Sequence, residues 1–118
     1  MKKVIIIIRP NMYKKTKAAL EEVGFNAFSM ISVNGRGKVP VQYTAANNVE
    51  EKEQVDFHRF IAKKMIMVFI RDEDEERLIK AVMATNSTNN CGDGKIFVIP
   101  VHESIRIRTG ETKDEALV

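Results

Sequence analysis

The sequence predicts an α+β fold in which a strand–helix–strand unit occurs twice within 118 residues. In the first unit, the apolar runs Val4–Ile8 and Phe25–Val33 flank a stretch with helical spacing of apolar residues. In the second unit, Lys64–Ile70 and Lys95–Val101 flank a helix that begins near Asp72. Two such units joined by a long loop form the ferredoxin-like arrangement, a four-stranded antiparallel sheet with two helices on one face.

The first unit has local support for each element. The continuous β-branched run Val4–Ile8 ends at Arg9-Pro10, which predicts a central strand buried on both faces or nearly so. Asn11 is placed to cap the next helix, and Gly24 stands where a helix would end. Five residues are expected on the buried side of this helix: Met12, Thr16, Ala19, Leu20 and Val23.

The second unit repeats this pattern. Asp72 is expected to cap a helix whose acidic first turn, Glu73–Glu76, suits the positive end of the helix dipole. The predicted buried stripe of this helix consists of Leu78, Ile79, Val82 and Met83. Strict alternation over Ile105–Arg108 predicts a short fifth strand.

Between the units lies Lys38–Phe60, a polar stretch of 23 residues with weak periodicity. A loop of this length in a compact domain is usually functional or disordered. The alternative is an insertion without a role.

Composition indicates one globular domain over residues 1–118, with 44% apolar and 30% charged residues. The net charge of +3 is mild and the basic residues are interleaved with acidic ones, which argues against a nucleic-acid partner. A single cysteine, Cys91, fits a reducing cytoplasm, and with two histidines it makes no usual zinc site, so no metal-ligand set is expected. The apolar run after Met1 is too short for a signal peptide or membrane insertion.

The segment Gly92–Lys95 (GDGK) is compatible with two interpretations. It is not a Walker A motif, because Asn89 and Ile96 stand where that motif needs glycine and a hydroxyl residue. A turn before a strand is the commoner meaning of such a sequence. Glycines also let backbone N–H groups approach an anion, to which Lys95 adds a charge and Thr88 a hydroxyl.

Arg106 and Arg108 lie two residues apart, which would place both side chains on one face of a strand. Such a pair either lies in solvent on an edge strand, where its charge prevents pairing with another sheet, or binds a phosphate group. The residues alone leave both possibilities open.

The stretch GDGKIFVIPVHESIRIRTGE closely resembles the C-terminal signature of the PII signal-transduction family. The opening KKVIIIIRP, a first helix ending in glycine and the G-x-G of Gly35–Gly37 match as well, so that the resemblance covers the chain outside residues 39–60. It implies a trimeric cytoplasmic sensor that binds ATP or ADP in clefts between subunits and reports 2-oxoglutarate. The implied loops are a T-loop at about 38–60, a B-loop at about 85–95 and a C-terminal loop at about 102–118.

The resemblance also implies site residues, position by position. The B-loop wraps the phosphates, the two C-terminal arginines reach them from a neighbouring subunit, and further residues line the cleft. The implied nucleotide-binding residues are Ser29, Gly35, Gly37, Lys38, Lys63, Thr88, Gly92, Asp93, Gly94, Lys95, Arg106 and Arg108. The T-loop inserts into target proteins, and its expected partner-binding residues are Tyr43, Glu50, Glu51 and Glu53.

The T-loop departs from the family pattern. Val39 stands where the family has a glutamine that helps to hold magnesium and 2-oxoglutarate, and valine has no oxygen to offer. Direct binding of magnesium and 2-oxoglutarate by this chain is therefore expected to be weak. The divergent loop is most similar to the nitrogenase-associated (NifI-like) branch, in which two PII paralogues associate and shut off nitrogenase. The expected assembly is a homotrimer or a mixed assembly with a paralogue.

Other functions remain open at this point. The target of a PII-like regulator can also be an ammonium transporter or glutamine synthetase. An enzyme acting on a nucleotide would need a nucleophile–base pair, and no such constellation is close in sequence, so no catalytic residue is assigned. An RNA-binding ferredoxin-like domain would need aromatic residues on its central strands, yet Val4–Ile8 carries none and Lys95–Ile99 carries only Phe97.

Overall fold

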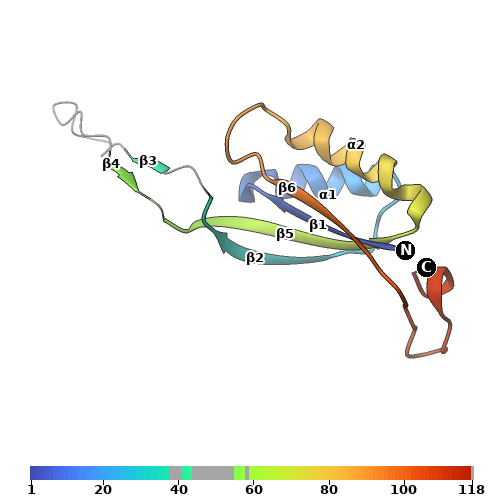
Figure 1. Cartoon of the computed structure of the whole chain (residues 1–118). Coiled ribbons are helices and arrows are strands. Elements are labelled where there is room, and N and C mark those ends of the chain that lie inside the picture. Colours follow the sequence, from blue (N-terminus) through green and yellow to red (C-terminus); the bar gives the residue numbers. More distant parts are fainter. Residues whose placement is uncertain (38–40, 44–54, 58, 118) are drawn as a thin grey trace.

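The computed structural model describes residues 1–37, 41–43, 55–57 and 59–117. Its main sheet has four strands in the order β2-β5-β1-β6, and all neighbouring strands are antiparallel. The strands are β1 (Lys2–Ile8), β2 (Ser29–Gly35), β5 (Ile61–Ile70) and β6 (Lys95–Pro100). Both helices, α1 (Tyr13–Glu22) and α2 (Glu75–Asn86), lie on one face of this sheet (Figure 1). The predicted ferredoxin-like fold is confirmed.

The core lies between the helices and the sheet face that they cover. Alternate residues of β1 and β5 point toward the helices, so that buried and half-buried residues alternate from Lys3 to Ile8. The buried apolar side chains are Val4, Ile6, Ile8, Leu20, Phe25, Ile66, Val68, Ile70, Leu78 and Val82.

The opposite face of the sheet, called the open face below, is left uncovered by α1 and α2 (Figure 1). Ile5 and Ile7 of β1 lie on it and are half-buried, whereas Val4, Ile6 and Ile8 on the helix side are buried, so that β1 is buried on one face and partly buried on the other. Alternate residues of the neighbouring strands, Phe69, Phe97 and Ile99 among them, are exposed there. A strand without a second layer of helices is fully buried on one side only.

Helix α1 ends as the sequence predicts. Gly24 has a positive φ of 97°, and the Phe25 N–H donates to the Leu20 carbonyl at 2.8 Å. The strand β2 begins at Ser29, so the expected start at residue 25 is wrong. Phe25 lies between α1 and β2 and is buried.

Both predicted helix caps are wrong. Each helix is preceded by a short 3-10 turn, η1 (Pro10–Met12) and η2 (Asp72–Asp74), and neither helix has a side-chain cap. Asp72 instead accepts a hydrogen bond at 2.9 Å from the N-terminal amine of Met1. This carboxylate therefore ties the start of β1 to the end of β5.

Within the predicted T-loop, β3 (Val41–Tyr43) pairs antiparallel with β4 (Val55–Phe57). This two-stranded ribbon lies beyond the end of β2 and β5, away from the helices (Figure 1). Five residues named from the sequence, Lys38, Val39, Glu50, Glu51 and Glu53, lie outside the described residues. The bounds of the T-loop stay a prediction.

The expected strand at Ile105–Arg108 is wrong. Ile105 makes only an isolated bridge with Thr112, and the chain turns between them. The turn is held by a 2.7 Å hydrogen bond from the Gly110 N–H to the Arg106 carbonyl, with Gly110 at a φ of 73°. A short 3-10 helix, η3 (Lys113–Leu117), follows. Alternation alone does not make a strand where no neighbouring strand continues.

Candidate functional site

The Asp93 side chain organises the loop between α2 and β6. Its carboxylate accepts hydrogen bonds from the Thr88 N–H at 2.6 Å and from the Thr88 hydroxyl. The Asn90 N–H approaches it at 3.4 Å, and Arg9 Nη1 donates to it at 2.6 Å. These donors, Thr88 foremost, hold the pKa of Asp93 well below its usual range. The loop is therefore folded around a carboxylate that is ionised at neutral pH.

Two glycines of this loop have backbone conformations that disfavour other residues. Gly92 and Gly94 have φ values of 94° and 118°. A Cβ atom on Gly94 would lie 1.9 Å from the Ile7 carbonyl oxygen, so the loop passes directly against the backbone of β1. Within the described residues, the N–H groups of Cys91 and Gly92 donate no hydrogen bond. An anion could accept hydrogen bonds from these backbone N–H groups.

Two cations converge on the same loop. Lys63 Nζ donates to the Gly92 carbonyl at 2.8 Å, and Arg9 Nη2 donates to the Cys91 carbonyl at 2.9 Å. Burial lowers the pKa of Lys63, the nearby Arg9 charge lowers it further, and Asp93 partly opposes them. An anion beside Lys63 would therefore relieve an electrostatic cost.

Arg9 is a site residue that the sequence reasoning did not assign. It was treated as the end of the first strand, although a cation that follows a central strand and precedes proline is an available signal. Its partners Cys91 and Asp93 lie more than eighty positions away, at 82 and 84 residues. No local pattern could have connected them.

Lys95 pairs with Ile7, and Lys63 lies on alternate positions of β5 with Met65 and Met67. Both lysines therefore stand on the open face, at the end of the sheet where β1 finishes. Gly35 lies beside Lys63, since a Cβ on Gly35 would be 3.7 Å from Lys63 Cγ. The structure thus brings Gly35, Lys63, Thr88 and the 92–95 loop to one end of the sheet.

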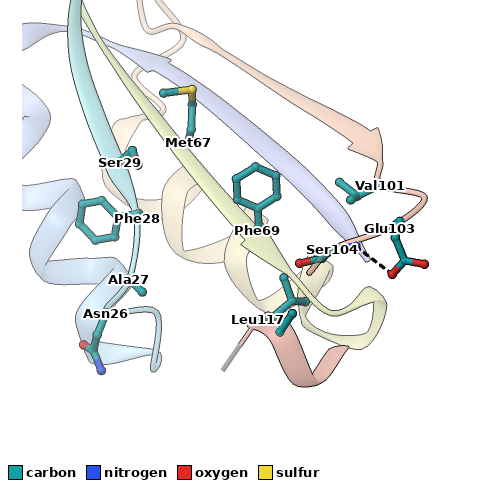
Figure 2. Close-up of a pocket in the computed structure, with 11 residues that line it drawn as sticks. Asn26, Ala27, Phe28, Ser29, Met67, Phe69, Val101, Glu103, Ser104 and Leu117 are labelled. Atoms are coloured by element: carbon teal, nitrogen blue, oxygen red, sulfur yellow. Dashed lines mark hydrogen bonds between the residues drawn. The ribbon is translucent and has the colours of Figure 1, made fainter. Parts of the chain in front are cut away.

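A pocket of about 530 Å³ lies at the other end of the open face. Figure 2 shows Ser29, Met67 and Phe69 on its strand side and Val101, Ser104 and Leu117 on the side of the C-terminal segment. Ser29 pairs with Met67 across β2 and β5. The pocket therefore combines an apolar wall with a few hydroxyl and carboxylate groups.

The two C-terminal arginines stand near this second end and have different surroundings. Arg106 Nη1 donates to Glu111 Oε2 at 3.0 Å, and Arg106 Nη2 donates to the Glu115 carbonyl at 3.2 Å. Arg108 is exposed on the turn. Because Arg108 lies on a turn, the expectation that both side chains share one face of a strand is wrong.

The loop and the arginines are separated by the length of β6. Lys95 pairs with Ile7 and Pro100 with Lys2, so that the two ends of β6 are roughly 17 Å apart at the usual rise per residue. Figure 1 shows the loop before β6 and the C-terminal segment at opposite ends of the sheet. Ser29 also lies away from the loop, at the far end of β2. The residues implied for one nucleotide site thus fall into two groups within a single chain.

The remaining residues from the sequence analysis are less informative. Gly37 is exposed, and Tyr43 lies on β3 opposite Val55. Among the residues that the structure describes, no group of three His, Cys, Asp or Glu side chains could hold a metal ion. In that same part of the chain, no helix is long and apolar enough to cross a membrane.

Residues 1–111 match the family described as "Nitrogen regulatory protein P-II". The chain belongs to the PII family. It is 43% identical to "Nitrogen fixation nifHD region GlnB-like protein 2" of Methanothermobacter marburgensis, covering 99% of this chain and 100% of that one. The protein of the same name from Methanothermococcus thermolithotrophicus is 40% identical, over 99% of this chain and 98% of the relative. These names confirm the nitrogenase-associated branch that the sequence predicts.

Other PII proteins are more distant. The "Nitrogen regulatory protein P-II" of Cereibacter sphaeroides is 33% identical, with 99% of this chain and 100% of the relative covered. The crystal structure of Arabidopsis thaliana PII bound to citrate superposes with a TM-score of 0.74 at 28% identity, covering 98% of this chain and 88% of that one. This PII chain is therefore a nitrogen regulatory protein by family, with the family's fold.

Proposed function

We propose that this PII protein binds ATP or ADP between subunits of a trimer and controls nitrogenase through its T-loop. It acts as a regulator rather than as an enzyme. The observation that carries the proposal is the position of its cationic groups. Lys63, Lys95 and the glycine loop lie at one end of the open face, and Arg108 lies beyond the other end.

The loop end suits a polyphosphate. It offers the free N–H groups of Cys91 and Gly92 together with the charges of Arg9, Lys63 and Lys95. Backbone donors beside fixed cations are the usual means of holding phosphate oxygens. The negative charge of Asp93 is offset by the Arg9 guanidinium paired with it, and its carboxylate shapes the loop through Thr88.

The pocket at the other end suits a nucleobase. Met67 and Phe69 supply an apolar surface, and Ser29 and Ser104 supply polar groups at its edge (Figure 2). We infer that the site is shared between subunits, because the glycine loop and the C-terminal arginines lie beyond opposite ends of β6, which are roughly 17 Å apart. The phosphate end of one subunit would then meet the pocket and arginines of another.

The open face favours such an assembly. Phe69 is 51% exposed, Phe97 46% and Ile99 42%. A contiguous apolar face of this kind marks an interface. A cyclic assembly would cover it and repeat the shared site at each contact. A paralogous PII chain could take the place of one or more copies.

Control of nitrogenase is proposed from the relatives whose names place them in nitrogen fixation regions. The T-loop, with the β3–β4 ribbon at its base, would carry the contact with the target. The response to 2-oxoglutarate would be weak in this chain alone, because Val39 supplies no oxygen ligand.

The proposal can be tested by calorimetry with ATP and ADP, together with light scattering to determine the mass of the assembly. We expect saturable nucleotide binding by a trimer, and inhibition of the partner nitrogenase that disappears when Val41–Gln54 is deleted. Phe97→Asp should break the trimer, whereas Ala84→Asp, on the exposed side of α2, should not. Tight ATP binding by a stable monomer would contradict the proposal.

A further inference from the structure

Helix α1 carries its charges in the reverse of the favourable order. Three lysines lie in its first half, Lys14, Lys15 and Lys17, and its last two residues are Glu21 and Glu22. The structure describes all of α1, and the helix has no acidic residue in its first turn and no basic residue in its last. Lysines near the positive end of the helix dipole destabilise a helix, and like charges three positions apart repel each other. The lysines therefore weaken the helix that carries them.

Helix α2 shows that the fold does not require this arrangement. Its first turn contains Glu75 and Glu76, and the preceding turn η2 is acidic as well, which suits the helix dipole. Local rules of this kind are commonly broken at functional sites. The reversed order in α1 therefore points to a use for its lysines.

The side chains of Lys14, Lys15 and Lys17, called the α1 lysine patch below, are exposed. Lys14 and Lys15 form no hydrogen bond or ion pair with any residue that the structure describes. Lys17 approaches Glu21 Oε1 only at 4.0 Å, and both of these side chains are about half exposed. So long and exposed a pair contributes little. The charges of the patch are thus available to a partner outside the chain.

The patch lies at the end of the molecule from which the β3–β4 ribbon extends, called the T-loop end below. The turn η1 joins the end of β1 to α1, so the first half of α1 lies where β1 finishes. Gly35, the last residue of β2, pairs there with Ile61, the first residue of β5, and both strands lead toward the ribbon (Figure 1). A protein bound by the T-loop would therefore lie next to the patch.

Charge is divided between the two ends of the molecule. The acidic run Asp72–Glu76 follows β5 at the end of the sheet where β1 begins. Basic side chains at the T-loop end, besides the patch, include those of Arg9, Lys63, Lys64 and Lys95. Lys63 and Lys95 belong to the proposed phosphate site on the open face, whereas α1 lies on the opposite face of the sheet. The proposed nucleotide site therefore does not account for the patch.

We propose that the α1 lysine patch is a docking surface for an acidic surface, rich in Asp and Glu side chains, on the protein that the T-loop engages. Opposite charges across an interface speed association and fix the relative orientation of the partners. A contact on the body of the regulator also holds the bound protein at a second point beside the T-loop. The identity of that protein rests on the proposed function, whereas the chemistry of its surface follows from the patch.

A labelled polyglutamate peptide tests the patch without the target protein. Saturating ATP is added so that the proposed phosphate site is occupied. We expect the peptide to bind at low salt, to shift the NMR signals of the Lys14 and Lys15 amides, and to dissociate as salt is added. Lys14→Glu should weaken binding about fivefold. Lys80→Glu makes the same charge change on the exposed side of α2 and should leave the affinity unchanged.

The same two variants can be compared with nitrogenase, the target in the proposed function. Lys14→Glu should slow association and make it less dependent on salt, whereas Lys80→Glu should do neither. If the wild type does not bind nitrogenase, the proposed target is wrong, and the peptide measurement decides on the patch.

Absence of peptide binding at low salt would overturn the proposal, as would equal losses of affinity in Lys14→Glu and Lys80→Glu. Displacement of the peptide by ATP would also overturn it, because the peptide would then occupy the phosphate site. Phosphatidylglycerol vesicles and single-stranded DNA are the remaining probes. Tighter binding of either one than of the peptide, with the same loss in Lys14→Glu, would assign the patch to a membrane or a nucleic acid instead of a protein.

Discussion

Arg9 Nη1 lies 2.6 Å from Asp93 Oδ1, although the two residues are 84 positions apart in the chain. The contact ties the glycine loop before β6 to the end of β1. Thr88 secures the same carboxylate from within the loop. The shape of the proposed phosphate site thus depends on one ionised side chain.

Asp93→Asn should weaken this loop without changing the fold. Asparagine keeps one acceptor oxygen but loses the charge that Arg9 approaches, so the loop should open more often and ATP affinity should fall about tenfold. Calorimetry and amide hydrogen exchange at Thr88 check this. Asp114→Asn, on η3 and exposed, is the matched control with the same charge change. Unchanged affinity and exchange in Asp93→Asn would show that the carboxylate does not shape the loop.

The stability of the loop around Asp93 should also depend on pH. The pKa of Asp93 is lower in the folded protein than in the unfolded chain, where it is about 4. Its contribution to stability is therefore fully present above about pH 4 and is lost as the pH falls below that value. Hydrogen exchange of the Thr88 amide should accelerate relative to the core of β1 as the pH is lowered through this range. The acceleration should be absent in Asp93→Asn.

Gly94→Ala should be strongly destabilising. Its new Cβ would overlap the Ile7 carbonyl, so that β1 and β6 must separate, at a cost of at least about 3 kcal/mol. Gly24→Ala also requires a positive φ but meets no atom within 4 Å, and it should cost about 1–2 kcal/mol. Thermal or denaturant unfolding of the two variants checks the difference. Equal losses would mean that the close approach to Ile7 carries no extra cost.

The isolated chain should respond poorly to 2-oxoglutarate. Magnesium and the effector need an oxygen ligand where Val39 stands, and Pro40 also removes a backbone donor. We expect weak or no binding of 2-oxoglutarate in the presence of Mg-ATP, with partial rescue by Val39→Gln. Calorimetry of the two proteins checks this, and co-expression with a paralogue should restore binding as well. Micromolar affinity of the unmodified chain alone would contradict the prediction.

The apolar pattern predicted the sheet, its helices and the fold, because side-chain period follows directly from backbone geometry. The pattern failed where contacts between residues far apart in the sequence determine the structure. Alternation at Ile105–Arg108 predicted a strand, but the chain turns at Gly110 and no strand lies there to pair with it. Asp72 was expected to cap a helix and instead binds the N-terminal amine.

The candidate site shows the same division. Gly92, Gly94 and Lys95 could be singled out from their local sequence, since each acts through backbone conformation or charge. Arg9 could not be assigned, because its partners lie at the other end of the chain. The buried hydrogen bond from Asn86 Nδ2 to Thr16 Oγ1 likewise joins residues 70 positions apart.

The central claim is that each nucleotide site is shared between two subunits, and mixing two defective variants tests it most directly. Lys95→Ala removes a charge at the loop end, and Arg108→Ala removes one at the C-terminal end, so each variant alone should bind ATP at least about tenfold more weakly. In trimers refolded from an equal mixture, a shared site should regain both residues at about a quarter of the contacts. Calorimetry should then find this fraction of sites with wild-type affinity. If mixing restores none, each site lies within a single chain and the account is wrong.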